Sequence, residues 1–266
     1  MARRPASPSL RRRPRARQLT LPEFFDSIAA PERTTRARAP IVPPGKGFVI
    51  ALWDDSRTAL APWAAAGFEC RYHSPSSWLD LANLAASYTH DSPVFACAFP
   101  DSTDLSIAGA RWFKEKRKQD PQFQQKAANR FADVEQFFRQ CACPYLIEGP
   151  AVGRLRQLWR RPEFTYHPCH YGGYLSTDDS HPLYPTIIPR RDAYQRGSGV
   201  WIGGGMRLPA RRPVEPEWVY HYSVRKRERR RMNPIVFARG PDGRAARACP
   251  PRGFALAVCK RLTKGV

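Results

Sequence analysis

The chain has 266 residues, enough to bury a core as one large domain or as a domain with a smaller lobe. A hydrophobic content of 42% with seven tryptophans excludes a disordered chain, and 27 prolines argue against a simple helical bundle. The 44 lysines and arginines give a formal charge of +21, which favours a polyanionic partner, nucleic acid first and an anionic membrane surface second. An effect on solubility alone is the alternative.

Residues 1–46 form a basic arm ahead of the predicted core. Arginines alternate there with prolines and serines, a composition that cannot build a core and predicts disorder. We expect Arg11, Arg12 and Arg13 to lie along nucleic-acid phosphates, and an arm without a specific role is the alternative. No apolar segment follows the basic residues, so the arm is not a secretory signal. No apolar run approaches the roughly 18 residues of a membrane span, and we expect no membrane partner.

The core is predicted to begin with a strand, a helix and a second strand. Residues 48–53 are apolar and β-branched, residues 58–66 are helix-like and residues 68–72 form the second strand. The polar stretch Asp54-Asp55-Ser56-Arg57 stands between the first strand and the helix, where nucleotide-binding sheets carry their phosphate or cofactor loop. That stretch contains no glycine, so the usual cradle is missing.

Strands and helices continue to alternate through residue 150. A helix is expected at 78–88, a buried strand at 94–99, and a long amphipathic helix at 113–140 whose aromatic stripe belongs to the core. A strand at 145–147 delivers Glu148 at its carboxyl end. This order predicts a mainly parallel, three-layer α/β sheet. The polar loop after residue 99 is a candidate site, because such loops carry sites in these sheets, although a simple helix cap is the alternative.

The second half is irregular and basic. From residue 166 to 216 prolines, glycines, tyrosines and histidines dominate. His167, Cys169 and His170 lie too close together for a standard metal site, so no metal is expected. The seven cysteines, with no CxxC pair, fit reduced thiols packed in a cytosolic protein.

A dense charge run follows, and an apolar segment comes near the carboxyl end. As a helix, residues 225–231 would be basic on every face, which suits contact with phosphates. The expected nucleic-acid contacts are Arg225, Lys226, Arg227, Arg229, Arg230 and Arg231. A nuclear-type address or a solvated loop are the alternatives. Residues 254–258 predict a short apolar helix that packs back on the sheet.

Several motifs together resemble a known family. They are Phe99-Pro100-Asp101-Ser102-Thr103-Asp104, then Ala108-Gly109-Ala110-Arg111-Trp112-Phe113, and later Glu148-Gly149-Pro150-Ala151-Val152-Gly153-Arg154-Leu155. The chain resembles the short, phage-type branch of the DNA cytosine-C5 methyltransferases. Members of that branch carry a Pro-Cys-Thr loop, a Ser-Gly-Ala-Arg-Trp-Phe-like helix start and Glu-Asn-Pro-Val-Gly-Arg-Leu. The resemblance spans residues 47 to 260.

The resemblance implies a fold and a division of the chain. The fold would be a Rossmann-like methyltransferase sheet with a small irregular target-recognition lobe. The expected parts are a basic arm at 1–46, a core at 47–175, a basic recognition lobe at 176–232 and a segment at 233–266 that packs on the core. DNA would be the partner and S-adenosylmethionine the cofactor. The location would be the cytoplasm, that of the bacterial host if the chain is phage-encoded.

The resemblance also assigns roles to single residues. In the family a cysteine thiolate adds to C6 of a flipped-out cytosine, and a glutamate at the N3 edge stabilises the adduct. Ser102 stands at the cysteine position, Glu148 matches the glutamate, and Arg154 would face the base or a phosphate. The cofactor would lie against Asp54, Asp55, Ser56 and Pro100.

Four departures from the family pattern predict that methyl transfer is impaired or absent. Ser102 offers an alcohol, a far weaker nucleophile than a thiol. The cofactor loop lacks glycines, Tyr72-His73 stands where an acidic residue would grip the ribose, and Gly149 replaces an asparagine. We therefore predict a methyltransferase-like protein that binds DNA and places a flipped cytosine at a Ser102/Glu148 pocket. The alternatives are an inactive DNA-binding member, or another base-modifying reaction that uses Ser102 with Asp101 or Asp104.

Overall fold

The computed structural model describes residues 47–88, 91–223 and 228–264. The basic arm with Arg11, Arg12 and Arg13 lies outside the described residues, as do Arg225, Lys226 and Arg227. The predictions made for these six side chains therefore have no structural counterpart here.

In the described residues, six strands form one sheet and two form a separate ribbon. The strands are β1 Phe48–Leu52, β2 Glu69–His73, β3 Phe95–Ala98, β4 Tyr145–Pro150, β5 Phe164–Tyr166, β6 Ser198–Gly203, β7 Val219–Ser223 and β8 Glu228–Met232. The sheet has the order β2-β1-β3-β4-β6-β5. Strands β1 to β4 run parallel, while β6 runs antiparallel to both β4 and β5. The predicted, mostly parallel α/β sheet is confirmed, and it is compatible with a Rossmann-like fold.

Helices connect and cover the strands. The α-helices are α2 Ala61–Ala65, α3 Trp78–Ser87, α4 Phe113–Gln119, α5 Phe123–Gln140, α6 Leu155–Leu158, α7 Gly240–Ala248 and α8 Arg252–Lys264. The 3-10 helices are η1 Thr103–Leu105, η2 Ile107–Trp112, η3 Pro168–His170, η4 Gly172–Tyr174, η5 Arg190–Asp192 and η6 Pro234–Val236. No helix in the described part of the chain is long and apolar enough to cross a membrane.

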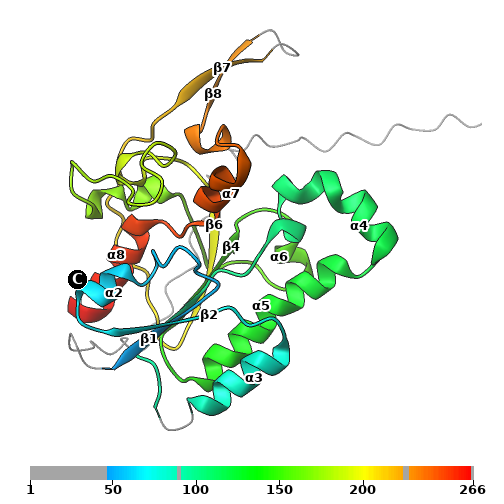
Figure 1. Cartoon of the computed structure of the whole chain (residues 1–266), viewed down its shortest axis with the longest axis vertical. Helices are drawn as coiled ribbons and strands as arrows, with labels where there is room; N and C mark the ends of the chain where they lie inside the picture. The colour runs from blue at the N-terminus through cyan, green and yellow to red at the C-terminus, as the bar shows by residue number, and fades with distance from the viewer. Residues whose placement is uncertain (1–46, 89–90, 224–227, 265–266) are drawn as a thin grey trace, which may run out of the picture. The chain divides into compact units, whose positions relative to one another are not determined.

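Two apolar clusters lie on opposite faces of the sheet and create the three layers drawn in Figure 1. On one face, Ile50 and Ile147 of the sheet pack with α3 and with the aromatic stripe of α5, which includes Phe131. On the other face, Val49 packs with Trp63 of α2 and with the apolar side of α8. Because both faces are covered, β1 and β3 are buried along their whole length, and their sequences are continuous apolar runs.

The structure corrects the sequence-based elements at several points. The long helix expected at 113–140 is broken between α4 and α5, because Pro121 follows Asp120, the residue that ends α4 in an extended conformation. Glu148 lies within β4 rather than after it. Residues 198–203, assigned from the sequence to a recognition lobe, form β6 between β4 and β5 and belong to the core sheet.

The carboxyl-terminal segment packs back on the sheet, as the apolar pattern of residues 254–258 predicts. Its helix α8 is longer than expected and supplies Phe254 and Val258 to the buried face. Asp192, which is 1% exposed, accepts a hydrogen bond from the backbone N–H of Gly253 (2.8 Å) and ties η5 to α8. Burial raises the pKa of Asp192 to about 6, although this hydrogen bond and the nearby Arg252 lower it in part.

Candidate functional site

The order of the strands marks one edge of the sheet as the place for a ligand. From β1 the chain moves outward to β2, and it then crosses to the other side of β1 to form β3 and β4. In open α/β sheets ligands bind outside the carboxyl ends of the strands at such a reversal. Three segments meet this edge here: residues 53–58 after β1, residues 99–106 after β3 and residues 148–154 at the end of β4.

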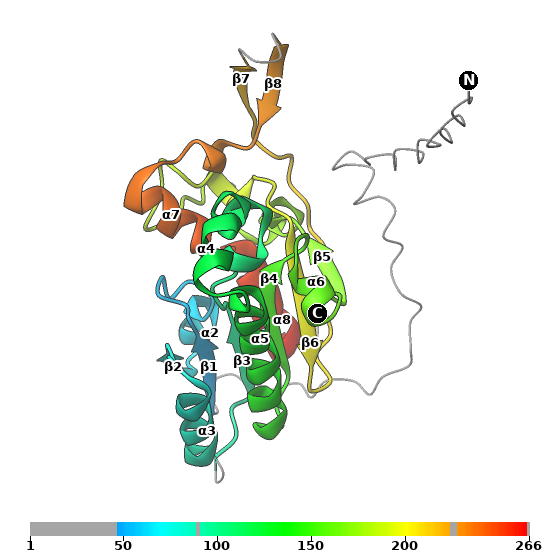
Figure 2. The same cartoon turned by 90° about the vertical axis from the view of Figure 1, so that its right-hand side faces the viewer.

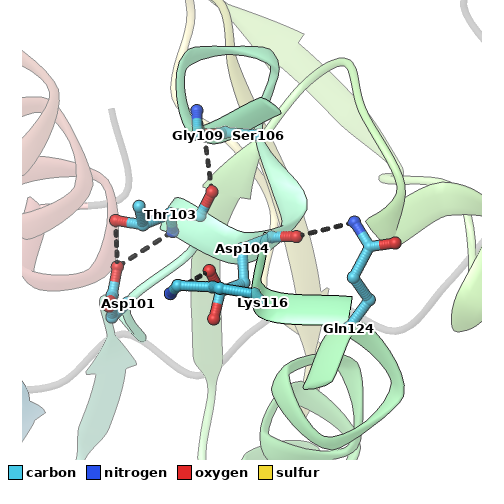
Figure 3. A network of polar contacts seen from close by, with 7 residues as sticks. All are labelled: Asp101, Thr103, Asp104, Ser106, Gly109, Lys116 and Gln124. Atoms are coloured by element: carbon cyan, nitrogen blue, oxygen red, sulfur yellow. Dashed lines mark hydrogen bonds and ion pairs between the residues drawn. The ribbon is translucent and has the colours of Figure 1, made fainter. Parts of the chain in front are cut away.

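Ser102 lies in the second of these segments, within a loop whose two carboxylates are engaged elsewhere. Asp101 Oδ1 accepts hydrogen bonds from the backbone N–H (2.9 Å) and from Oγ1 (2.7 Å) of Thr103. Asp104 Oδ1 pairs with Lys116 Nζ at 2.5 Å, a contact that reaches across to α4. Figure 3 shows both interactions.

The backbone of the Ser102 loop, residues 100–106, is held from several sides. Gln124 Nε2 on α5 donates to the carbonyl oxygen of Asp104 (2.9 Å), and Ser106 caps η2 by accepting from the N–H of Gly109 (Figure 3). A Cβ on Gly109 would lie 1.9 Å from the carbonyl oxygen of Thr103, so this close approach requires glycine. The loop is therefore well ordered by contacts that do not involve the Ser102 side chain.

The Ser102 hydroxyl is half-buried, and no base in the described part of the chain bonds to it. The residue begins η1, yet its side chain makes no capping hydrogen bond, and only its carbonyl oxygen accepts, from the N–H groups of Leu105 and Ser106. Asp101 and Asp104, the two carboxylates considered from the sequence, bond to Thr103 and Lys116 instead. Pro100, expected near the cofactor, is buried at the start of the loop.

Unlike the Ser102 hydroxyl, the Glu148 carboxylate accepts hydrogen bonds from three side-chain donors. Arg196 Nη2 (2.8 Å) and Ser198 Oγ (2.7 Å) donate to Oε1, and Tyr166 Oη (2.8 Å) donates to Oε2. These partners come from β5, β6 and the segment just before β6, so the strand pairing assembles the cluster. We call Glu148, Tyr166, Arg196 and Ser198 the Glu148 centre.

Arg196 was not foreseen from the sequence, although it forms the only ion pair of Glu148 among the described residues. Its Nη1 also donates to the carbonyl oxygens of Arg247 and Cys249 (3.3 Å to Cys249), which connects the centre to the end of α7. Burial alone would lower the pKa of Arg196, but Tyr194 and Glu148 raise it above its ordinary value, so the guanidinium stays charged. No signal in the sequence marked it, because β6 itself was not predicted.

Arg154, expected to face a base or a phosphate, lies away from Glu148. Its side chain is exposed and Nη1 donates to Gln157 Oε1 (2.7 Å). Its backbone N–H, however, donates to the carbonyl oxygen of Leu105 (2.8 Å). A Cβ on Gly153, at φ 128°, would lie 2.2 Å from that same oxygen. The segment after β4 therefore packs directly on the Ser102 loop.

The loop after β1 satisfies its own polar groups. Asp54 is buried, and its carboxylate accepts from Ser56 Oγ (2.7 Å) and from the backbone N–H of Ala59 (2.8 Å). Burial raises the pKa of Asp54, and these hydrogen bonds lower it in part. Asp55 is exposed. Arg57 has a φ of 56°, so the loop adopts at this position a left-handed conformation that glycine favours, although it contains no glycine.

Side chains fill the space beyond β2. Arg57 lies over the ring of Tyr72, with its Cζ 5.2 Å from the ring centroid. His73 Nε2 and Tyr88 Oη are 2.9 Å apart, and burial lowers the pKa of His73. On the α8 side of β3, an apolar cavity lined by Cys97 and its neighbours measures about 20 Å³. That is room for roughly one water molecule, against roughly 300 Å³ or more in ordinary small-molecule sites.

The described part of the basic run, residues 228–231, forms a strand and not the helix considered from the sequence. Residues 228–232 form β8, which pairs in antiparallel register with β7, because the alternating Val219-Tyr220-His221-Tyr222 stretch offers it a partner strand. Arg229, Arg230 and Arg231 therefore lie on a two-stranded ribbon. A second basic segment, missed from the sequence, adjoins the Ser102 loop. It comprises Arg111, Lys114, Lys116, Arg117 and Lys118 on η2 and α4.

Neither metals nor known relatives add to this picture. Within the described ranges, no group of three or more His, Cys, Asp or Glu side chains is placed to hold a metal ion. All seven cysteines are free thiols, six of them buried. No protein-family model matches the chain, and no curated protein matches its sequence.

Proposed function

We propose that this chain is a DNA-binding protein built on a cytosine-C5 methyltransferase-like scaffold, and that it does not transfer methyl groups. The observation that carries the proposal is the state of Ser102. It stands where the resemblance places the nucleophile, and both carboxylates of its loop are bonded to Thr103 and Lys116. An alcohol without a base is too weak a nucleophile to add to a pyrimidine ring at neutral pH.

The Glu148 centre supports recognition of a flipped cytosine without chemistry. A carboxylate has about four acceptor positions, and three donors occupy those of Glu148. One position remains for a donor such as the exocyclic amino group of cytosine. Arg196 holds the carboxylate in place through its ion pair (2.8 Å). In this role Glu148 orients a base and moves no proton.

The residues at the carboxyl ends of β1 and β2 do not fit S-adenosylmethionine. Asp54 and Ser56 are turned onto their own loop, where the Asp54 carboxylate accepts from Ser56 Oγ and from the backbone N–H of Ala59. No carboxylate is available for a ribose at the end of β2, because Tyr72 and His73 stand there and Arg57 covers the ring of Tyr72. S-adenosylmethionine therefore has no part in the proposed function.

The charge distribution supports DNA as the partner. The formal charge of +21 is extreme, and the basic residues of η2 and α4 lie directly beside the Ser102 loop. Lys116 is paired with Asp104, but Lys114, Arg117 and Lys118 are exposed. Lys118 contacts Glu115 only through an exposed ion pair, which phosphates can readily replace. A polyanion that follows this surface passes beside the Ser102 loop.

Two measurements test the proposal together. Fluorescence anisotropy with a labelled DNA duplex should show binding that weakens steeply as salt rises, because each neutralised phosphate contributes about 0.9 to the log–log slope. Titration calorimetry with S-adenosylmethionine should show no heat, with and without DNA. Absence of DNA binding would contradict the proposal, and so would methyl transfer to cytosine by the unaltered chain.

An impaired methyltransferase is the second candidate, favoured by the left-handed φ at Arg57, which keeps the backbone form of a glycine loop. The substitution Ser102→Cys separates the two candidates. If only the nucleophile is missing, this variant gains methyl transfer. We expect it to remain inactive, because the loop after β1 is also altered. The paired substitution Ser102→Ala serves as the control for changes in DNA affinity alone.

A further inference from the structure

The β7–β8 ribbon is an element without a covering layer of its own. Its strands pair only with each other in the described part of the chain and form a sheet separate from the six-stranded one. In Figures 1 and 2 the ribbon extends beyond α7, away from the main sheet. A two-stranded ribbon is at best marginally stable in water unless another surface packs on it. The exposed aromatic side chains it carries therefore need an explanation.

One face of the ribbon combines tyrosines with arginines. The register sets Tyr220 opposite Arg231 and Tyr222 opposite Arg229. Directly opposed residues of an antiparallel pair point to the same face, and so do residues two apart on one strand. These four side chains therefore share one face, which we call the Tyr–Arg face. Tyr220 is 69% exposed and Tyr222 is 55% exposed.

A neighbouring ring contacts this face at its base. The Cζ atom of Arg231 lies 4.2 Å from the centroid of the Trp218 ring, the residue just before β7. This cation–π contact restricts the side chain without neutralising its charge. In the described residues, no ion pair engages Arg229 or Arg231. The face thus presents two uncompensated positive charges beside two flat, apolar rings that end in hydroxyl groups.

We infer that the Tyr–Arg face of the β7–β8 ribbon enters the major groove of duplex DNA. This inference rests on the proposed function, which supplies DNA as the partner. What it adds is the element that contacts the DNA and the groove that this element enters. The major groove of B-form DNA is about 12 Å wide and admits a two-stranded β-ribbon. Arginines there bond to guanine edges or to phosphates, and the tyrosine rings pack on thymine methyl groups and sugars. The major groove of duplex RNA is too narrow and deep to admit the ribbon.

The test compares two double variants of the full chain with a control that removes the same number of positive charges as the arginine variant. The ribbon variants are Tyr220→Ala with Tyr222→Ala, and Arg229→Ala with Arg231→Ala. The control is Arg130→Ala with Arg139→Ala, exposed arginines on α5. Thermal unfolding of each variant establishes that the core is intact.

We expect each ribbon variant to lose on the order of tenfold or more in affinity for a labelled DNA duplex. The control should bind like the unaltered chain. The tyrosine variant should keep the salt slope of the unaltered chain, since no charge is removed. A duplex RNA of the same sequence should compete at least on the order of tenfold less well than the DNA.

Several results would overturn the inference. If the ribbon variants bind duplex DNA as tightly as the control, the face serves another partner, such as an acidic protein, while the proposed function stands. If duplex RNA competes equally well, the ribbon does not enter the major groove. If the unaltered chain does not bind DNA at all, the inference and the proposed function fail together.

Discussion

The Glu148 centre and the Ser102 loop lie at the same edge of the sheet but are built in opposite ways. Three side chains, from β5, β6 and the segment just before β6, converge on the Glu148 carboxylate, whereas the Ser102 hydroxyl makes no side-chain hydrogen bond within the described residues. The first arrangement also holds the fold together, through the contacts of Arg196 with Arg247 and Cys249. The polar groups of the first region therefore stabilise the fold, whereas the hydroxyl of the second contributes no such contact.

The largest effect is expected from breaking the Glu148 centre. Arg196→Ala removes the ion pair of a carboxylate that is 8% exposed and leaves two backbone carbonyl oxygens without this donor. We expect a loss of about 3 to 5 kcal/mol in the free energy of unfolding, measured with urea. Arg154→Ala, on the exposed arginine of the same edge, should change stability by less than about 0.5 kcal/mol. Equal effects would mean that the centre has no structural role.

Asp192 tests how a buried carboxylate that forms no ion pair within the described residues affects stability. Its pKa of about 6 lies above the value near 3.8 expected when unfolded, so folding favours the protonated form. The stability of the unaltered chain, relative to Asp192→Asn, should be greatest below pH 4 and should decline as pH rises to 6. The total decline should be about 2 to 3 kcal/mol. Urea unfolding of both proteins across this range provides the measurement, and a constant difference would refute the assignment.

A smaller effect is expected at Gly149, which lies against two packed aromatic rings. A Cβ at this position would lie 2.8 Å from Phe131 Cε1 and 3.1 Å from Trp201 Cζ3, so the packed aromatic rings exclude an asparagine. Gly149→Asn should destabilise the fold by about 1 to 3 kcal/mol in urea unfolding. Phe131→Leu makes room for the new side chain. It should therefore lower the free energy of unfolding less in the Gly149→Asn variant than in the unaltered chain. Additive losses would argue against the clash.

The smallest effect is expected at Ser102 itself. Ser102→Ala removes a hydroxyl group without a side-chain partner and should change the free energy of unfolding by less than about 0.5 kcal/mol. Asp101→Ala is the matched comparison, since it removes the acceptor of both Thr103 hydrogen bonds and should cost about 1 kcal/mol. A large loss of unfolding free energy for Ser102→Ala in the same urea experiments would contradict the difference between the Ser102 loop and the Glu148 centre.

Local sequence patterns were sufficient for the parallel part of the sheet. The apolar runs of β1 and β3 and the stripe of α5 are signals of period and composition, and each element lies where they predict. The same reasoning placed Ser102 and Glu148 at one edge, because loops and strand ends of parallel strands share that edge. The break at Pro121 was missed when one helix was expected at 113–140, although proline disfavours a helical conformation in the residue before it.

The remaining features depend on partners distant in sequence. Strand β6 pairs with β4 across about fifty residues, and nothing within residues 198–203 indicates that neighbour. Strand β8 consists largely of arginines, so its conformation is set by β7 rather than by its own pattern. Arg196 acquires its role only when β4, β6 and α7 are assembled. Periodicity carries no information on such contacts.

Helix α8 has a consequence for the synthesis of the chain. It covers the face of β1 and β3 that includes Val49 and Phe95, although those strands leave the ribosome some 150 or more residues earlier. Until residues 252–264 are synthesised, α8 does not cover that apolar surface. The exposed surface promotes aggregation of nascent chains. Chaperone dependence during expression should therefore be governed by the last helix, whose Phe254 also stacks on Tyr166 of the Glu148 centre (ring centroids 4.3 Å apart).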